Sequence, residues 1–154
     1  MTAAADLSCR FAAGPAAVRT ALAAVADALD DRIDRRHARL TVELVLAEVL
    51  NNILEHACTD RADHRIGLDL WIRRDRVCCV VFDDGRAMPQ GAPPRPTPLR
   101  PHALPERGFG WRLIRGLTSE FGYLRVAGCN VLILHLPLPK AQGAAAHLPD
   151  GARI

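Results

Sequence analysis

Hydrophobic positions along the chain follow two different periods, which predicts a domain built from both helices and strands. Between residues 42 and 57, apolar side chains recur every three or four positions, as on one face of a helix. Between residues 66 and 72, every second residue is apolar, as in a strand with one buried face. Residues 77–82 form an unbroken apolar run, which is typical of a strand at the centre of a sheet. An α/β fold is the prediction.

The same patterns and the turn residues between them place the remaining elements. The predicted strands cover residues 7–11, 66–72, 77–82, 123–127 and 131–136, and the predicted helices cover residues 16–29, 40–58 and 111–121. Pro15 supports the start of the first helix, because proline fits the first helical position. Residues 128–130 predict a hairpin between the last two strands.

Two segments lack either period. Residues 86–107 are rich in proline, and a structureless connection of this length is commonly a lid, a binding loop or disorder. Residues 140–154 are rich in alanine, glycine and proline, and we expect a disordered tail there. The folded domain is predicted to cover residues 1–139.

Composition excludes several classes of protein. A chain of 154 residues suits one domain, and it has no run of eighteen apolar residues that would predict a membrane span. The first residues lack the features of a secretory signal, so we expect a cytoplasmic protein. Five cysteines without a C-x-x-C pair argue against a disulfide framework or zinc ribbon. The net charge of +3, without interleaved aromatics, gives no reason to expect direct nucleic-acid binding.

Three polar clusters stand at the ends of predicted elements. Glu48, Asn52 and His56 are four residues apart on one helix, so they share neighbouring parts of its surface. Asp83 and Gly85 follow the central strand, and a G-x-G sequence, residues 108–110, precedes the last helix. The first cluster alone is better explained as a solvated helix face. The other two change that interpretation.

Each cluster suits one chemical need of nucleotide binding. A carboxylate such as Asp83 can accept a hydrogen bond from the exocyclic amine of adenine, and Gly85 allows the backbone to approach the ring. Glycines before a helix present N–H donors and the positive end of the helix dipole to phosphates. The side-chain oxygen of Asn52 is a suitable ligand for Mg²⁺. The three clusters together predict a site for Mg²⁺ and ATP.

In this order, the clusters resemble the three nucleotide-binding boxes of the GHKL (Bergerat-fold) ATPase superfamily. The N-box corresponds to residues 48–57, the D-x-G-x-G box to residues 83–89 and the G-x-G box to residues 108–115. Within that superfamily, residues 7–138 resemble the bacterial anti-sigma serine kinases of the RsbW and SpoIIAB type. The resemblance implies a two-layer α/β sandwich, with three helices on one face of a mixed, mostly antiparallel sheet.

The resemblance also implies roles for individual residues. Glu48 would be the general base for an attacking serine hydroxyl, and Asn52 would hold Mg²⁺. His56 would line the nucleotide site or simply cap or pack at the end of its helix. Ala87 replaces the second glycine of the D-x-G-x-G box, which reduces backbone freedom there. The remaining nucleotide-binding positions are Asp83, Gly85, Ala87, Arg107, Gly108, Phe109 and Gly110.

The function that the resemblance implies is regulatory phosphorylation. The expected substrate is a serine of a STAS-domain anti-anti-sigma protein, and a sigma factor or comparable regulator is the expected alternate partner, with a homodimer as a further possibility. One alternative is a non-catalytic module that uses the same fold to bind a partner. Another is a histidine-kinase-like ATPase that acts on a separate phosphoacceptor. The absence of histidine from residues 16–29 argues against autophosphorylation on histidine.

Overall fold

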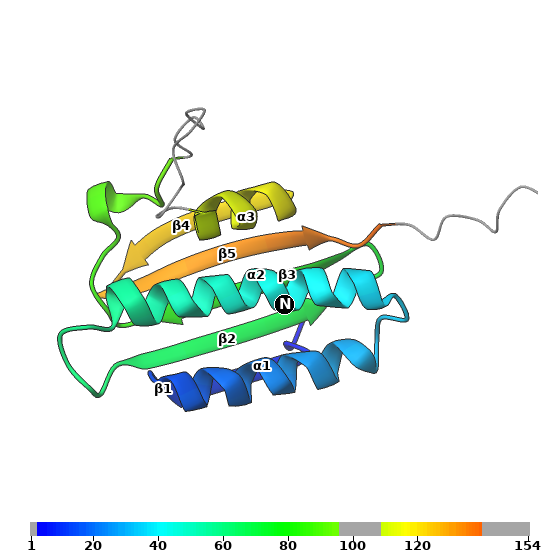
Figure 1. Ribbon diagram of the computed structural model, residues 1–154, viewed down its shortest axis with the longest axis horizontal. Coiled ribbons are helices and arrows are strands. Elements are labelled where there is room, and N and C mark those ends of the chain that lie inside the picture. Colours follow the sequence, from blue (N-terminus) through cyan, green and yellow to red (C-terminus); the bar gives the residue numbers. More distant parts are fainter. Residues whose placement is uncertain (1–2, 96–108, 140–154) are drawn as a thin grey trace, which may run out of the picture.

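One face of a five-stranded sheet carries all three α-helices that the structure describes (Figure 1). The structure, a computed structural model, describes residues 3–95 and 109–139. The strands are β1 (Leu7–Ala12), β2 (Arg65–Ile72), β3 (Arg76–Asp83), β4 (Glu120–Val126) and β5 (Cys129–Pro137). The α-helices are α1 (Pro15–Asp30), α2 (Arg36–Asn52) and α3 (Phe109–Leu117), and two single turns are η1 (Ile53–Ala57) and η2 (Pro89–Gly91).

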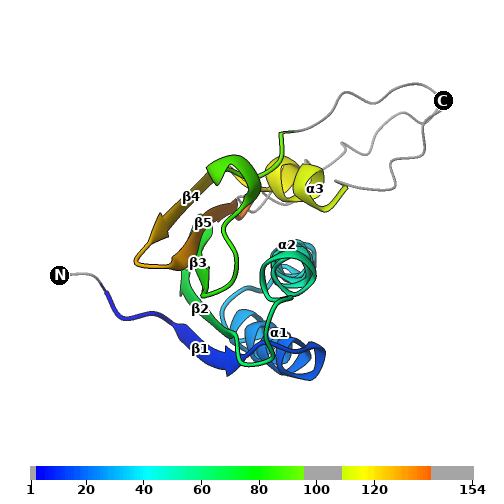
Figure 2. The same cartoon turned by 90° about the vertical axis from the view of Figure 1, so that its left-hand side faces the viewer.

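The strand order is β1-β2-β3-β5-β4, and every neighbouring pair is antiparallel. The predicted two-layer sandwich with three helices on one face is therefore confirmed (Figure 2). The described strands include no parallel pair, so the sheet is antiparallel rather than mixed. As its continuous apolar sequence predicts, β3 lies at the centre, between β2 and β5.

The core lies between the sheet and the first two helices. α1 buries an apolar stripe at three- and four-residue intervals, and α2 continues it with a denser set. These side chains meet the inner face of the sheet, where alternate residues of β2, β3 and β5 are buried. Removing water from this apolar surface is the main source of stability for such a layer. The largest fully buried side chains include Leu29, Leu46, Leu50, Leu68, Leu70, Leu134 and Leu136.

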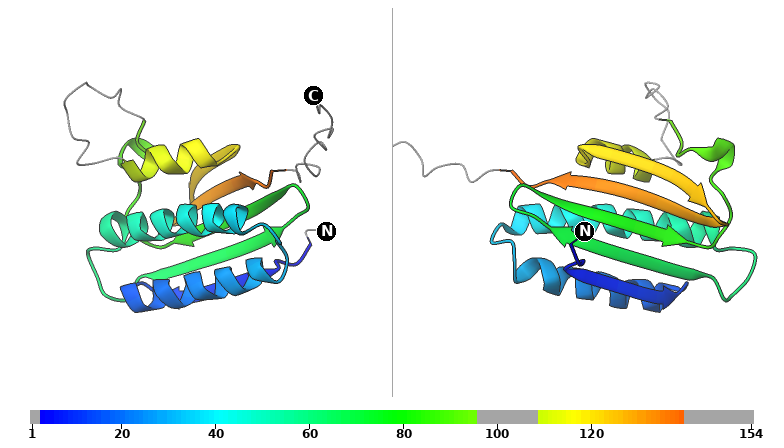
Figure 3. Two further views of the ribbon diagram at one scale, coloured as in Figure 1. Left: turned by 45° about the vertical axis from the view of Figure 1, so that its right-hand side comes forward. Right: turned by 180° about the vertical axis from the view of Figure 1, so that it is seen from behind.

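The outer face of the sheet carries none of these helices (Figure 3). There the Phe82 ring lies over Gly67, where an added Cβ would be only 2.0 Å from the ring. The Arg10 guanidinium lies 4.4 Å from the centroid of the same ring. Further along this face, Leu124 and Ile133 are exposed apolar side chains. Along each strand, successive side chains point alternately to this outer face and to the buried face.

Several element boundaries differ from the prediction. α2 begins at Arg36, four residues before the predicted start, because Ala38 is buried and Arg39 bonds to the Asp30 carboxylate at 2.9 Å. α3 ends at Leu117 and β4 begins at Glu120, so Phe121 belongs to the strand and not to the helix. Its ring meets Trp111 edge-on, with 5.8 Å between centroids.

The hairpin between β4 and β5 is confirmed, but its turn lies earlier than predicted. The turn residues are Ala127 and Gly128, with φ angles of 48° and 84°. A two-residue turn with positive φ at both residues matches the twist of the two strands that it joins. Cys129 and Asn130 consequently belong to β5, and Asn130 lies opposite Asp83 on β3.

Of the segment predicted as a lid, the structure describes residues 86–95. This part includes η2, where Gln90 has a φ of 59°. Residues 96–107 of the predicted lid and the predicted tail, residues 140–154, lie outside the described residues. In the described portion of the chain, no helix has the length and apolar character needed to cross a membrane.

Candidate functional site

The C-terminal half of α2 and the start of α3 meet at Gly110. An added Cβ at Gly110 would lie 2.6 Å from Glu48 Oε2 and 3.5 Å from Asn52 Nδ2. Because Glu48 and Asn52 are four residues apart, both side chains leave α2 on the side of α3. The structure thus brings together the first residues of the N-box with the second glycine of the G-x-G box.

Asn52 carries a buried polar atom that the fold leaves unused. Its Nδ2 has no hydrogen-bond partner within the described residues. Buried polar groups are almost always paired, since an unpaired one costs free energy. The amide of Asn52 and the carboxylate of Glu48 are both oxygen donors of the type that Mg²⁺ prefers. The residues present therefore fit the predicted magnesium site.

His56 lies apart from this pair. It belongs to η1, a π-helical turn with i→i+5 hydrogen bonding, so the four-residue spacing does not continue on one surface. Its side chain is 70% exposed, and its Nε2 lies 3.9 Å from Glu55 Oε2. His56 thus neither packs on the core nor joins Glu48 and Asn52 in any described contact.

Asp83 ends β3 with its carboxylate facing the interior. The residue is 4% exposed, and its Oδ1 accepts hydrogen bonds from the Gly85 amide at 2.9 Å and from Asn130 Nδ2 at 2.8 Å. Burial raises the pKa of this carboxyl above its usual value, whereas the two hydrogen bonds oppose that shift. A buried acceptor held in one orientation is thereby provided at the end of the central strand.

Gly85 allows the loop after β3 to touch the end of η1. An added Cβ at Gly85 would lie 2.5 Å from the Ala57 carbonyl oxygen. That carbonyl accepts a hydrogen bond from the Arg86 amide at 2.9 Å. Glycine is required here by close approach of two backbones, and the contact joins the N-box to the D-x-G box.

A polar network at the start of β5 supports the same loop. Asn130 donates to the Arg86 carbonyl at 2.9 Å as well as to Asp83. Its Oδ1 accepts from the Tyr123 hydroxyl at 2.8 Å and from Arg125 at 2.6 Å. The sequence did not predict these residues as part of the site, because Asn130 was placed in the turn. The turn is made by Ala127 and Gly128, both with positive φ, and this puts Asn130 on the strand.

A family comparison decides what kind of domain this is. The model of the family described as "Histidine kinase-like ATPase domain" matches residues 11–136. The chain belongs to this family. The matched range includes the three segments predicted as nucleotide-binding boxes, and the predicted GHKL relationship is confirmed.

Solved structures agree on the fold of this histidine kinase-like ATPase domain. It is similar to a structure of the RsbU and RsbW domains of Rv1364c from Mycobacterium tuberculosis, with 17% identity and a TM-score of 0.56, covering 86% of this chain and 33% of that one. It is also similar to the blue-light activated histidine kinase EL346 of Erythrobacter litoralis, with 22% identity and a TM-score of 0.51, covering 80% and 42%. The domain thus spans less than half of each of these chains. No curated protein sequence is matched significantly.

The other predicted positions of the ATPase domain have different placements. Among the described residues, the non-glycine residues with positive φ are Gln90 and Ala127, so Ala87 adopts a conformation that needs no glycine. The expected loss of backbone freedom at Ala87 therefore brings no strain in this structure. Phe109 begins α3 and is 63% exposed. Arg107 and Gly108 lie outside the described residues.

A buried histidine fixes Asp84, the neighbour of Asp83. His64 is 2% exposed, and its ring nitrogens lie 2.9 Å from Asp84 Oδ1 and 2.6 Å from Asp60 Oδ1. The hydrogen bond to Asp60 chiefly raises the pKa of His64, against the opposite effect of burial. Asp84 also accepts from the Arg65 amide at 2.9 Å. Asp84 thereby anchors the segment that precedes β2.

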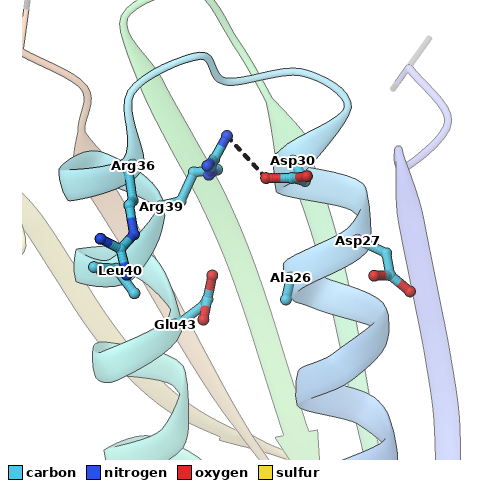
Figure 4. A pocket seen from close by; sticks show the side chains of 7 residues that line it. All are labelled: Ala26, Asp27, Asp30, Arg36, Arg39, Leu40 and Glu43. Carbon is cyan, nitrogen blue, oxygen red and sulfur yellow. Dashed lines mark ion pairs between the residues drawn. The ribbon is translucent and has the colours of Figure 1, made fainter.

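A separate groove lies between α1 and the N-terminal half of α2 (Figure 4). Its volume is about 310 Å³, and the Arg39–Asp30 ion pair, at 2.9 Å, lies in its wall. The groove contains none of the predicted nucleotide-binding residues, so we do not assign it to ATP. Its lining residues are Ala26, Asp27, Asp30, Arg36, Arg39, Leu40 and Glu43.

Proposed function

We propose that this ATPase domain is an anti-sigma regulatory serine kinase, which binds ATP with Mg²⁺ and phosphorylates a partner protein. The observation that carries the proposal is the meeting of Glu48 and Asn52 with Gly110 at the start of α3. A carboxylate, a metal-binding amide and a helix N-terminus are the parts that phosphoryl transfer requires in kind.

The nucleotide would lie between the loop after β3 and the start of α3. Asp83 would accept a hydrogen bond from the exocyclic amine of adenine, because it is a buried carboxylate held at the end of the central strand. The N-terminus of α3 favours the negative phosphates, and Gly110 keeps the space beside Glu48 open. Asn52 would hold Mg²⁺, and that ion, when bound, neutralises charge on the phosphates.

Glu48 would act on the attacking hydroxyl. The serine oxygen forms a bond to the terminal phosphorus while the bond from that phosphorus to the bridging oxygen of ADP breaks. The serine proton passes to the Glu48 carboxylate, and ADP leaves with the electron pair of the broken bond. General-base catalysis of this kind contributes about 10²–10⁴-fold to a rate.

The proposed partners follow from the likeness to anti-sigma kinases. The serine would belong to a STAS-domain anti-anti-sigma protein, and a sigma factor or comparable regulator would be the alternate partner. The similar structure that contains an RsbW domain supports this choice by fold alone. A homodimer is also part of the proposal.

The test is transfer of labelled phosphate from ATP to the STAS-domain protein encoded nearest to this chain. We expect acid-stable phosphoserine on the partner. Glu48→Gln should retain ATP binding but lower the transfer rate at least about one hundredfold. Glu43→Gln, on the same helix but in the α1–α2 groove, is the matched control and should transfer normally.

Each alternative function has its own outcome in this experiment. Partner binding without any phosphate transfer by the wild type would favour a non-catalytic binding module. Acid-labile phosphate on a separate protein would favour a histidine-kinase-like ATPase. An undiminished rate in Glu48→Gln would remove Glu48 as the base.

A further inference from the structure

The polar contacts between the end of β3 and the start of β5 converge on the side chain of Asn130. Asn130 is 5% exposed and lies directly opposite Asp83 in the register of these two neighbouring strands. Residues paired in this way have side chains on the same face of the sheet. The Asn130 amide therefore lies beside the Asp83 carboxylate, which the proposed function assigns to binding the base of ATP.

All the hydrogen-bonding capacity of the Asn130 amide is used. A carboxamide has two N–H donors and two acceptor lone pairs. The Nδ2 donates to Asp83 Oδ1 at 2.8 Å and to the Arg86 carbonyl at 2.9 Å. The Oδ1 accepts from the Tyr123 hydroxyl at 2.8 Å and from Arg125 at 2.6 Å. Rotating the amide by half a turn would break all four bonds, so its orientation is fixed.

The partners of Asn130 extend this restraint along the loop. The Tyr123 hydroxyl also accepts a hydrogen bond from the Met88 amide at 3.1 Å. Arg125 also donates to the Gly85 carbonyl at 3.1 Å. Thus two side chains of β4, through Asn130 and directly, hold the backbone that follows Asp83.

The same contacts fix the orientation of the Asp83 carboxylate and oppose the rise in its pKa that burial causes. The bonds from Asn130 and from the Gly85 amide both end on Oδ1, which limits rotation of the carboxylate. Hydrogen bonds to a carboxylate favour its ionised form, and that form only accepts hydrogen bonds. An acceptor fixed in this way discriminates between a base with an exocyclic amine and one without it.

We propose that Asn130 is a positioning residue of the nucleotide site, which orients Asp83 toward the exocyclic amine of the base and holds the loop of residues 83–88 in its binding shape. This inference rests on the proposed nucleotide binding and does not depend on the identity of the partner protein. Asn130 itself acts through Asp83.

The test compares two nucleotides by calorimetry in the presence of Mg²⁺: ATP and purine riboside triphosphate, which lacks the 6-amino group. The wild type should bind ATP more tightly. Asn130→Ala removes a hydrogen bond to a charged group, so it should bind ATP about tenfold to one hundredfold more weakly. It should bind the analogue almost as well as the wild type does, so most of the discrimination is lost.

Two further variants keep the test decisive if Asn130→Ala does not fold. Tyr123→Phe leaves the amide in place but removes one of its donors, and should cost a few-fold in ATP affinity only. Asn130→Asp keeps the size of the side chain but faces Asp83 with a second carboxylate, which raises the apparent pKa of the pair. Its ATP affinity should therefore recover only at higher pH than that of the wild type.

The control is Ile133→Val, on the outer face of β5, which should leave both affinities unchanged. Equal losses for ATP and the analogue in Asn130→Ala would overturn the inference, because they indicate a merely structural role. Wild-type affinities in all three network variants would overturn it as well. Failure of the wild type to bind ATP would overturn the proposed function and this inference with it, whereas ATP binding with equal losses in Asn130→Ala would overturn this inference alone. The two failures are therefore distinguishable.

Discussion

The two sides of the candidate site are built in opposite ways. On the sheet side, Asp83 and Asn130 are both at least 95% buried, and the Asn130 amide has a partner for each of its four hydrogen-bonding positions. On the helix side, Glu48 and Asn52 approach Gly110 closely, and Asn52 Nδ2 is buried without a partner in the described residues.

In the proposed function, the sheet side recognises the base of ATP and the helix side carries out phosphoryl transfer. A base-binding pocket gains from groups that are fixed before the ligand arrives, since ordering them on binding costs free energy. On the proposed phosphate side, the unpaired Nδ2 of Asn52 is a donor that a phosphate oxygen could accept from, whereas its Oδ1 is the atom suited to Mg²⁺. The polar atom left unpaired is therefore as informative about function as the network that is complete.

Alanine substitution of Gly85 and of Gly110 tests this difference between the two sides most directly. Gly85→Ala should have the largest effect on stability. Its Cβ would meet the Ala57 carbonyl, which is backbone and has little freedom to move. We expect the free energy of unfolding to fall by about 1–3 kcal/mol, measured by urea denaturation. Gly14→Ala, where nothing lies within 4 Å of the added Cβ, is the control. Equal stability of the two variants would contradict the close approach of η1 to the loop.

A smaller effect is expected from the charge of His64, which supports the sheet side only. Its pKa is raised in the folded state, so its contribution to stability is complete below the unfolded pKa of about 6.5 and is lost as pH rises through the folded pKa. The urea midpoint of the wild type should thus fall between pH 6 and pH 8. His64→Gln should lack that component, whereas His56→Gln, at an exposed position, should keep it. The same pH dependence in His64→Gln and the wild type would show that His64 does not carry it.

The smallest effect on stability is expected from Gly110→Ala, on the helix side. Its Cβ would meet only the far end of the flexible Glu48 side chain, which can rotate away. The free energy of unfolding should change by less than about 1 kcal/mol, with any change favouring the helix. Transfer to the partner serine should nevertheless fall about tenfold, because the base is displaced. Gly116→Ala, in the same helix with open space around it, should leave transfer unchanged. Normal transfer by Gly110→Ala would show that the position of Glu48 is not critical.

Periodicity was sufficient to predict the architecture, because burial against one layer imposes it on every element. The alternation of Ile66, Leu68 and Leu70 indicated a strand with one buried face, and the continuous run of β3 indicated a central strand; the structure confirms both. Boundaries were less predictable where polar residues enter an element. Arg36 and Arg39 belong to α2 although their sequence is typical of a connection, since packing of Ala38 decides the helix start.

The site was predictable to the extent that it consists of local boxes. Glycine spacing located Gly85 and Gly110, and the structure gives a steric reason for each. The supporting residues Asn130 and His64 could not be predicted in this way, because their partners are distant in the sequence. Asn130 meets Asp83 only through strand register, and His64 meets Asp84 only when the segment before β2 folds back.

The hairpin turn at Ala127 and Gly128 gives the domain a sensitivity to insertions that point substitutions would not reveal. One residue added to this turn would shift β5 by one position against β4, and each shifted side chain would change faces of the sheet. Asn130 would then point away from Asp83, while Cys129 would take its place in the interior. Length variation in this exposed turn is thus expected to act on the nucleotide at a distance, and homologous chains should conserve the count of residues here more strictly than their identity.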